Sequence, residues 1–572
     1  MQECLAVSGH LRVAAAQIPN VVGDIDGNAQ NILAAMRWAE DEGADVVVFP
    51  ELALTGYPLA DLVLRRDFVA RAMAVLDELA AASGPVAAVV STVDRIPPRR
   101  SWDTQARTAA ISAAVLCDGE LRGIYHKVLL PNYETFDEAR NFAPGHTPDA
   151  VWRIGQACAG ISICEDLWSG DGPPEAQAAA GAQILLVPNA SPFHREKPTG
   201  RLKLVSQVAR RNGTPVVYVN SVGGQDELVF DGGSLIVDAK GELLYRAPQF
   251  QTELFWVDVP LGHERPVSPR ATTVHTRPKD PRPAEPAPEP IAPPSSDEQI
   301  WQALVMGTRD FVRRNGASSV VLGLSGGIDA AITAAIATDA LGPENVVGIA
   351  MPGPSSPRDE LDDARELAEA LDIRFETIPL RAPTSVVTDE LADVFAASLD
   401  ERASDTLQAR MRTAVLWAVC DQEGHLPLAT GNKSELSIGT ATLHGDMAGA
   451  FAPLKDCPKT LLYRLARLRN QRSPVIPERT LDRTPTAIAD SDSDGGPPPY
   501  DVLDDIVERY VELGQGVEEL RAQGFDVGVV RGVLQLVDSA ELKRRQTPPG
   551  VKITARAFGQ DLRMPITSAW RP

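Results

Sequence analysis

Proline dominates the segment from Gly262 to about Ser296, GHERPVSPRATTVHTRPKDPRPAEPAPEPIAPPSS. Proline removes backbone donors, and too few apolar residues remain in this segment to build a core. We therefore predict a linker at 263–296 that separates a domain at 1–262 from a second domain at 297–572. Each of these two domains is long enough to bury a core of its own.

Both halves alternate short strand-like runs with helical segments. The runs before the linker are VAAAQI, ADVVVFP, VAAVVST, TAAISAAVL, ACAGISIC, QILLVPNA, TPVVYVN and SLIVDAKG. Several of them are short, β-branched and bounded by Gly, Pro or Asn, as buried strands are. After the linker, SVVLGLS and NVVGIAMP predict strands, and DAAITAAIATDAL and PRDELDDARELAEALD predict helices. This alternation predicts an α/β fold with a doubly wound parallel sheet in the second half.

Two smaller features of the second half are predicted from local signals. Ser296 with Gln299 forms a capping box for a helix that we expect to end near Asn315. The irregular, Gly- and Pro-rich stretch at 490–499 predicts a loop inside the second domain.

Composition narrows the possible partners and the compartment. The formal charge of −22 argues against nonspecific nucleic-acid binding, which depends mainly on Lys and Arg. The six cysteines contain no CxxC pair, and the chain shows neither a signal peptide nor eighteen consecutive apolar residues. We therefore expect a cytoplasmic protein without a membrane span, in which any anionic ligand meets a local basic pocket.

Three candidate chemical groups follow strand-like runs in the first half. Glu51 comes after DVVVFP, Lys127 after GIYH and Cys164 after AGISI. Because strand ends collect at one edge of a sheet, we expect these residues to meet there. Hydrolysis of a carboxamide uses a thiolate that attacks the carbonyl, a carboxylate that moves protons and a cation that stabilises the oxyanion. Each residue alone is typical of an inert thiol or a solvated charge, so the sequence contexts carry the prediction.

Those contexts are FPELALTGYP, YHKVLLPNYETFDEARNF and GISICEDLW, and they resemble the Glu, Lys and Cys blocks of the nitrilase superfamily. More specifically, residues 11–260 resemble the glutaminase domain of glutamine-dependent NAD synthetases, which implies an αββα sandwich. The resemblance implies that Glu51 is the general base, Lys127 the oxyanion-side cation and Cys164 the nucleophile. It also implies that glutamine is bound by Tyr133, Glu165, Ser191 and Lys197.

The second half carries a glycine-rich turn, VVLGLSGGIDAA, between a predicted strand and a predicted helix. Such a turn lets backbone N–H groups approach a phosphate at the start of a helix. No GxxxxGK[ST] motif is present, which disfavours a Walker-type NTPase. The SGGxD order resembles the pyrophosphate loop of the ATP-pyrophosphatase group. This resemblance implies an ATP site that includes Gly323, Leu324, Ser325, Gly326, Gly327, Ile328, Asp329, Ala330 and Thr430.

Two later blocks, LATGNKSELSIGTATLHGDMAGAFAPLKDCPKTLLYRLARLRN and ELKRRQTPPGVKIT, resemble the corresponding stretches of NAD synthetases. The resemblance implies that Asp329 and Glu435 hold Mg²⁺, whose preferred ligands are hard oxygens. It further implies that Lys459 contacts substrate or phosphate, and that deamido-NAD is bound by Thr406, Glu435, Asp446, Lys455 and Lys543.

Together the resemblances imply a glutamine-dependent NAD synthetase, expected to be a homo-oligomer. Departures from the family pattern keep an alternative open: Ala330 replaces a serine, Thr406 an asparagine and His444 a tyrosine, and no tyrosine follows the MP of MPGPSSPRD. That alternative is a paralogous glutamine-dependent amidotransferase that acts on a different carboxylate. A simple amidase with a decayed second domain and a non-enzymatic binding protein are two weaker alternatives.

Overall fold

The computed structural model describes residues 9–96, 107–277, 284–354, 356–395, 397–483 and 497–570. The chain divides into two compact units. The first comprises Met1–Gln225 and Phe230–Pro294, and the second comprises Asp226–Val229 and Ser295–Pro572. Among the described residues, no helix is long and apolar enough to cross a membrane.

The first unit is built on two β-sheets. The order of the six-stranded sheet is β14 (Glu253–Pro260), β1 (His10–Gln17), β2 (Val46–Val48), β3 (Ala87–Arg95), β4 (Ala109–Cys117) and β5 (Glu120–His126). The order of the seven-stranded sheet is β13 (Leu243–Arg246), β12 (Leu235–Val237), β9 (Val216–Asn220), β8 (Ile184–Asn189), β7 (Ala157–Ile161), β6 (Val151–Ile154) and β15 (Thr272–Val274). A separate two-stranded ribbon contains β10 (Val222–Gln225) and β11 (Leu228–Asp231), of which Leu228 and Val229 are counted with the second unit.

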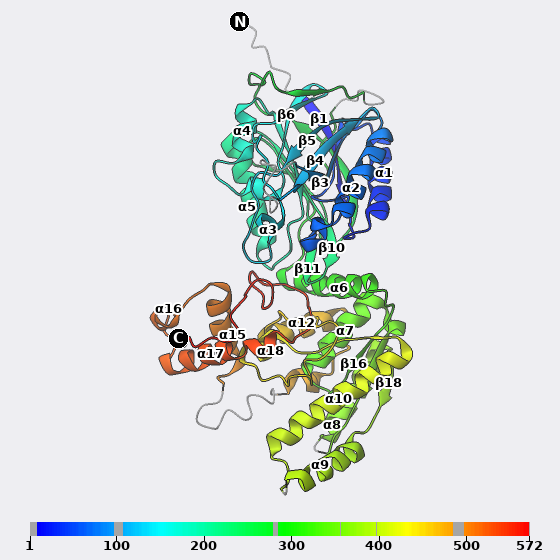
Figure 1. Ribbon diagram of the computed structural model, residues 1–572, viewed down its shortest axis with the longest axis vertical. Helices are drawn as coiled ribbons and strands as arrows, with labels where there is room; N and C mark the ends of the chain where they lie inside the picture. The colour runs from blue at the N-terminus through cyan, green and yellow to red at the C-terminus, as the bar shows by residue number, and fades with distance from the viewer. Residues whose placement is uncertain are drawn as a thin grey trace. The chain divides into compact units, whose positions relative to one another are not determined.

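Helices cover the outer faces of these sheets, with α1 and α2 on one side of the strands and α4 and α5 on the other (Figure 1). The helical elements are α1 (Ile25–Asp41), η1 (Ala60–Leu64), α2 (Arg66–Ala81), α3 (Glu138–Asn141), η2 (Cys164–Leu167), α4 (Pro173–Ala179) and α5 (Lys197–Asn212). Because each sheet is covered on both faces, strands such as β4, AAISAAVLC, are buried at every position. The predicted αββα sandwich is confirmed.

Part of the segment expected to be a linker belongs to the seven-stranded sheet. Thr272–Val274 form β15, which pairs in parallel with β6, and Val274 is buried. The proline-rich composition gave no sign of this strand, because the run of three residues is too short to produce an alternating pattern.

The second unit contains a parallel sheet in the order β18 (Arg374–Thr377), β17 (Val346–Ala350), β16 (Val320–Gly323) and β19 (Leu426–Pro427). Strands β17 and β18 extend the sheet to one side of β16, and β19 lies on the other side. The sheet order therefore reverses next to β16, which confirms the predicted doubly wound topology. Ligands in such sheets bind at this switch point, beyond the carboxyl ends of the strands.

The helical elements of the second unit surround this sheet and continue to the carboxyl end. They are α6 (Ser296–Arg314), α7 (Ile328–Leu341), η3 (Pro343–Asn345), α8 (Arg358–Leu371), α9 (Arg381–Phe395), α10 (Glu401–Glu423), α11 (Lys433–Ile438), α12 (Lys459–Arg472), α13 (Glu478–Asp482), α15 (Tyr500–Val507), η5 (Glu508–Glu512), α16 (Val517–Ala522), α17 (Val527–Ser539) and α18 (Glu541–Arg544). A cluster of buried residues between α11, α15 and α17 forms a local core, to which Leu503, Ile506 and Leu534 belong.

The capping box of Ser296 with Gln299 is wrong by one residue, because the N-cap of α6 is Ser295, whose hydroxyl accepts a hydrogen bond from the Glu298 amide at 3.3 Å. Two adjacent serines offered the same signal to the sequence pattern. Most of the loop expected at 490–499 lies outside the described residues.

Candidate active sites

Glu51, Lys127 and Cys164 lie close together in the first unit, each just past a strand end. Glu51 follows β2, Lys127 follows β5 directly, and Cys164 begins η2 shortly after β7. Strands β2 and β5 belong to the six-stranded sheet, whereas β7 belongs to the seven-stranded sheet. The expectation that the three residues share one sheet edge is therefore wrong, because they meet where the ends of two stacked sheets adjoin.

The Lys127 ammonium is bound by two buried carboxylates. Its Nζ lies 2.7 Å from Glu51 Oε1 and 2.8 Å from Glu138 Oε2, and the Lys127 and Glu51 side chains are 0% exposed. Burial by itself would lower the pKa of Lys127, but the charges of Glu138 and Glu51 outweigh burial and hold this pKa well above its usual range. Lys127 is thus a permanent cation at neutral pH.

Cys164 is a buried thiol in a left-handed backbone conformation, with φ at 44°. Burial raises its pKa well above the usual range, and the charge of Glu51 raises it further. The resting group is therefore a neutral thiol, and a thiolate forms only when a base takes its proton. Glu51 also accepts a hydrogen bond from the Ala190 amide at 3.3 Å, which holds its second carboxylate oxygen in place.

Glu138 completes this cluster and was not selected from the sequence. Its side chain is 4% exposed and accepts hydrogen bonds from Lys127 and, at 2.9 Å, from the Tyr57 hydroxyl. Burial raises the pKa of Glu138, and the Lys127 charge opposes that rise. The residue lies in the same FDEAR stretch as Asp137, so the local acidic run offered no means of choosing between them.

Of the predicted glutamine-binding residues, Tyr133 and Lys197 contact the segment that follows Cys164. The Tyr133 hydroxyl donates to Glu165 Oε2 at 2.9 Å, and Tyr133 itself is 48% exposed. The Lys197 ammonium lies 4.1 Å from the centre of the Trp168 ring, and burial lowers the pKa of Lys197. Ser191 is buried, and its amide donates to Asn220 Oδ1 at 2.8 Å. An exposed tyrosine beside a carboxylate and an ammonium suits the charged end of an amino acid.

A cavity of about 350 Å³ lies at the switch point of the second unit. Its wall includes eight of the predicted residues: Gly323, Leu324, Ser325, Asp329, Ala330, Thr430, Glu435 and Asp446. Gly326, at the tip of the loop, has a φ of 77°, and a Cβ there would lie 2.4 Å from the Glu360 carbonyl oxygen. Glycine is therefore required at this position. Gly327 caps α7, and Ile328 begins the helix, so the loop delivers the helix start to the cavity.

One lysine joins the two acidic residues that were predicted to bind the metal. Lys459 donates to Asp329 Oδ2, and its Nζ lies 3.5 Å from Glu435 Oε1. Asn432 lies beside both residues: its Nδ2 donates to Asp329 Oδ1 at 2.7 Å, and its Oδ1 accepts from the Glu435 backbone amide at 3.0 Å. Burial raises the pKa of Glu435 to about 7, and the charge of Asp329 adds to this rise. No group of three or more His, Cys, Asp or Glu side chains suited to a metal occurs within the described ranges.

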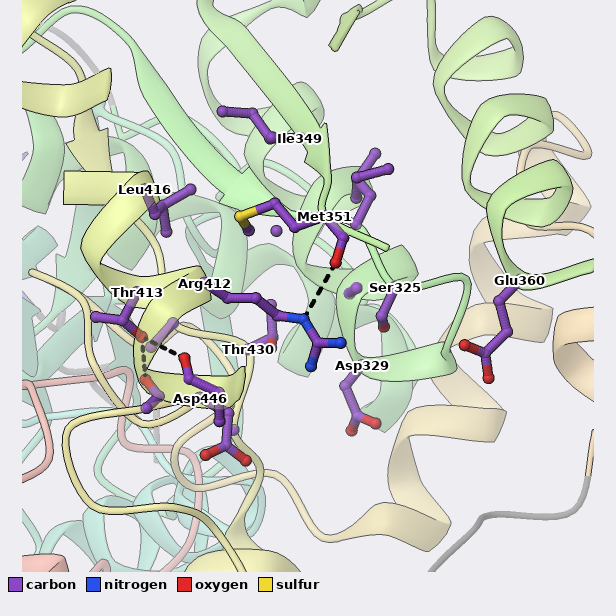
Figure 2. A pocket seen from close by; sticks show the side chains of 18 of the residues that line it. Ser325, Asp329, Ile349, Met351, Glu360, Arg412, Thr413, Leu416, Thr430 and Asp446 are labelled. Atoms are coloured by element: carbon purple, nitrogen blue, oxygen red, sulfur yellow. Dashed lines mark hydrogen bonds between the residues drawn. The ribbon is translucent and has the colours of Figure 1, made fainter. Parts of the chain in front are cut away.

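The cavity also exposes Arg412, which no sequence motif singled out. Figure 2 shows its guanidinium reaching the Met351 carbonyl, to which Nε donates at 3.2 Å, on a wall that also carries Thr430. Arg412 lies in LQARMRT, where Arg410 and Arg412 are two positions apart in α10. The sequence alone did not indicate which of the two faces the cavity.

Three predicted substrate residues lie outside the cavity wall. Thr406 donates to the Ala403 carbonyl at 3.2 Å within α10. Lys455 pairs with Glu227 at 2.6 Å, and Lys543 donates to the Gly439 carbonyl and, at 3.0 Å, to the Ala441 carbonyl. Lys543 thereby holds the loop between α11 and Asp446, and its role as a substrate ligand stays a prediction.

Two families match successive parts of the chain: the carbon-nitrogen hydrolase family over residues 12–268 and the NAD synthase family over residues 300–547. The chain thus belongs to a class of enzymes in which a carbon-nitrogen hydrolase unit is fused to an NAD synthase unit. The chain is 40% identical to a glutamine-dependent NAD(+) synthetase of Thermotoga maritima, covering 98% of this chain and 99% of that protein. It is 39% identical to the same enzyme of Xylella fastidiosa, covering 99% and 100%.

Among solved structures, the glutamine-dependent NAD+ synthetase of Acinetobacter baumannii in complex with adenosine diphosphate is similar to this chain. The two structures superpose with a TM-score of 0.73 and are 36% identical in sequence, and the alignment covers 97% of this chain and 98% of that chain. The chain belongs to the glutamine-dependent NAD(+) synthetase family.

Proposed function

We propose that the chain catalyses the glutamine-dependent amidation of deamido-NAD. Glutamine supplies ammonia, ATP activates the nicotinate carboxylate as an acyl-adenylate, and the products are NAD, AMP, pyrophosphate and glutamate. The family supports this reaction, and the substitutions Ala330, Thr406 and His444 call for a direct test of the acceptor. The family resemblance further supports a cytoplasmic homo-oligomer.

In the proposed glutaminase reaction Glu51 takes the Cys164 proton as sulfur attacks the glutamine carboxamide carbon. A base is needed because burial keeps the thiol protonated. The oxyanion that forms is stabilised by the permanent charge of Lys127. Glu51 then protonates the leaving ammonia, and a water attacks the resulting thioester to release glutamate and restore the thiol. Glu138 keeps Lys127 oriented and charged throughout.

In the proposed synthetase reaction ATP lies in the cavity beyond β16, with its phosphates at the glycine turn and the start of α7. Arg412 supplies positive charge in the cavity wall, and Lys459 lies at the loop carboxylate. A carboxylate oxygen of the acceptor attacks the α-phosphorus, and pyrophosphate departs from it. Ammonia then attacks the acyl carbon, AMP leaves, and the amide forms.

The two acidic residues beside Lys459 fit a magnesium ion that arrives with the phosphates. Asp329 and Glu435 direct hard oxygen atoms towards one ammonium group, which indicates that positive charge is favoured between them. When bound there, Mg²⁺ would neutralise charge on the departing pyrophosphate. Asn432 would hold the Asp329 carboxylate beside the backbone of Glu435.

The observation that supports this division of labour most directly is the buried contact of Lys127 with Glu51, with the Cys164 thiol beside both charges. The test is Cys164→Ala, assayed for NAD formation from deamido-NAD with glutamine and separately with ammonium. We expect the glutamine-dependent reaction to disappear and the ammonium-dependent reaction to stay within about threefold of wild type. Loss of both, or survival of both, contradicts the assignment. Parallel assays with other carboxylic acids distinguish deamido-NAD from a different acceptor.

A further inference from the structure

Asp166, two residues after the candidate nucleophile, receives four hydrogen bonds on a fully buried carboxylate. Its Oδ1 accepts from the amides of Val128 at 3.1 Å and Leu129 at 2.8 Å. Its Oδ2 accepts from the Ile163 amide at 3.0 Å and from the Tyr125 hydroxyl at 2.7 Å. The Asp166 side chain is 0% exposed, so these donors replace all of its contacts with water.

The four donors come from the chain segments that present the two reacting groups. Val128 and Leu129 directly follow Lys127, and Tyr125 lies in β5 just before it. Ile163 directly precedes Cys164. Because β5 and β7 belong to different sheets, one carboxylate joins the loop of the cation to the loop of the thiol.

The Cys164 loop has a reason to need such a restraint. Its backbone φ of 44° is uncommon for a residue with a Cβ and is kept only where the surroundings fix it. The Asp166 carboxylate accepts a hydrogen bond from the Ile163 amide, which closes the turn around Cys164. It also accepts hydrogen bonds from the Val128 and Leu129 amides, which attach this turn to the segment after Lys127. Without this anchor the sulfur is free to move relative to Lys127.

Packing alone does not account for a carboxylate at this position. A buried charge is costly unless it is fully hydrogen-bonded, and an apolar side chain would fill the same space at lower cost. Burial also raises the pKa of Asp166 to about 6, which measures how unfavourable the charge is at this place. An apolar side chain, however, could not accept hydrogen bonds from the backbone amides of both loops.

We propose that Asp166 is a positioning residue of the glutaminase reaction: it sets the distance between the Cys164 thiol and the Lys127 ammonium by tying their two loops together across the sheets. This inference rests on the proposed glutaminase function. Asp166 contacts no reacting atom, so its effect acts on the rate of the chemical step rather than on glutamine binding. A displacement of about 1 Å at a reacting centre costs about 100-fold in rate.

The decisive variant is Asp166→Asn, which has the same shape but replaces one acceptor oxygen with an N–H donor. The single oxygen of the asparagine side chain cannot accept hydrogen bonds both from the Ile163 amide and from the Val128 and Leu129 amides. The hydrogen-bonded connection between the two loops is therefore lost. We expect the kcat of glutamine hydrolysis to fall about 100-fold, with the KM for glutamine within about threefold of wild type. Ammonium-dependent NAD formation by the same full-length preparation should be unchanged, which reports that the second unit is folded, and an unchanged KM for glutamine reports that the first unit is folded.

Two further variants separate positioning from stability. Tyr125→Phe removes only one of the four donors and should lower kcat by about two- to tenfold. Asp258→Asn is the matched control, because Asp258 is also a buried carboxylate of the first unit but pairs with Arg12 at 2.8 Å, away from the cluster. It should lower the urea midpoint while leaving glutaminase kcat within about twofold of wild type.

The outcomes distinguish this inference from the function on which it rests. If Cys164→Ala abolishes glutamine hydrolysis and Asp166→Asn keeps wild-type kcat, the positioning role is overturned and the glutaminase function stands. If Asp166→Asn raises the KM without lowering kcat, or if Asp258→Asn lowers kcat equally at equal stability, the positioning role is also overturned. If Cys164→Ala still hydrolyses glutamine, the proposed function itself fails.

Discussion

Replacing Lys127 with methionine tests the central charge arrangement of the first unit. The ammonium is within 2.8 Å of carboxylate oxygens of both Glu51 and Glu138, and none of the three side chains is more than 4% exposed. Removing one partner of a buried ion pair typically costs about 3–5 kcal/mol, because the remaining charge is left without compensation. Burial already raises the pKa of Glu138, so this carboxyl takes up a proton in the variant and keeps the cost near the lower end of that range.

The same change removes the cation expected at the oxyanion, and loss of one such group typically lowers kcat by about 10²–10³-fold. Stability and catalysis are separated with the double variant Lys127→Met/Glu138→Gln, which no longer buries two facing carboxyl groups. Urea unfolding followed by fluorescence should show that the double variant regains about 1–3 kcal/mol relative to Lys127→Met. Its glutamine hydrolysis should stay as low as that of the single variant.

Ammonium-dependent NAD formation provides the internal control, since it does not require the first site. The reasoning is refuted if Lys127→Met unfolds within about 1 kcal/mol of wild type or keeps glutamine hydrolysis within about tenfold of it. It is also refuted if Lys127→Met/Glu138→Gln regains glutamine hydrolysis, because Lys127 would then act only as a structural counter-ion.

Three further predictions concern other parts of the molecule. Gly326→Ala places a Cβ against the Glu360 carbonyl at a positive φ, so ammonium-dependent kcat/KM for ATP should fall about tenfold or more while glutamine hydrolysis persists. Ala330→Ser adds a hydroxyl at the cavity wall, and the KM for ATP in the ammonium assay should fall by about two- to tenfold. Burial raises the pKa of Asp166 from 3.8 to about 6, so the folded state holds this proton more tightly and the associated stability is lost as pH rises through that window. The unfolding free energy of wild type minus that of Asp166→Asn should therefore fall by about 2–3 kcal/mol between pH 4 and 6 in urea titrations, and a flat difference would contradict the shift.

Buried strands were the part of the fold most readily predicted. The run TAAISAAVL was recognisable because a continuous apolar run of that length is typical of a strand covered on both faces. The structure agrees, since every residue of β4 is buried. Strands with mixed composition were missed: β14, ELFWVDVP, carries charged residues, and its place beside β1 follows from a pairing over more than 200 residues of chain. Local sequence periodicity cannot predict which strands pair over such a long stretch of chain.

Candidate site residues were predictable where a motif surrounds them and not where geometry alone selects them. Cys164 was identified from its block, whereas Glu138, although it lies within YHKVLLPNYETFDEARNF, was not singled out. Its contact with Lys127 depends on how the four-residue helix α3 directs the carboxylate. Arg412 was likewise not identified, because its place in the cavity wall depends on which side of α10 faces the cavity. The sheet assignment of Cys164 failed for a related reason, since strand order in two stacked sheets is set by packing rather than by succession along the chain.

Each unit holds a lysine between two carboxylates, and the exposure of those carboxylates separates their uses. Around Lys127 both carboxylates are at most 4% exposed, so no mobile cation can compete and the ammonium charge is a fixed part of the site. Around Lys459 the side chains of Asp329 and Glu435 are 20% and 25% exposed and both line the cavity. Water and ions can reach these oxygens, so we expect a cation that enters with a phosphate chain to share them with Lys459. A closed arrangement suits an oxyanion that forms at the same place in every cycle, whereas an open one suits a nucleotide that must bind, react and leave.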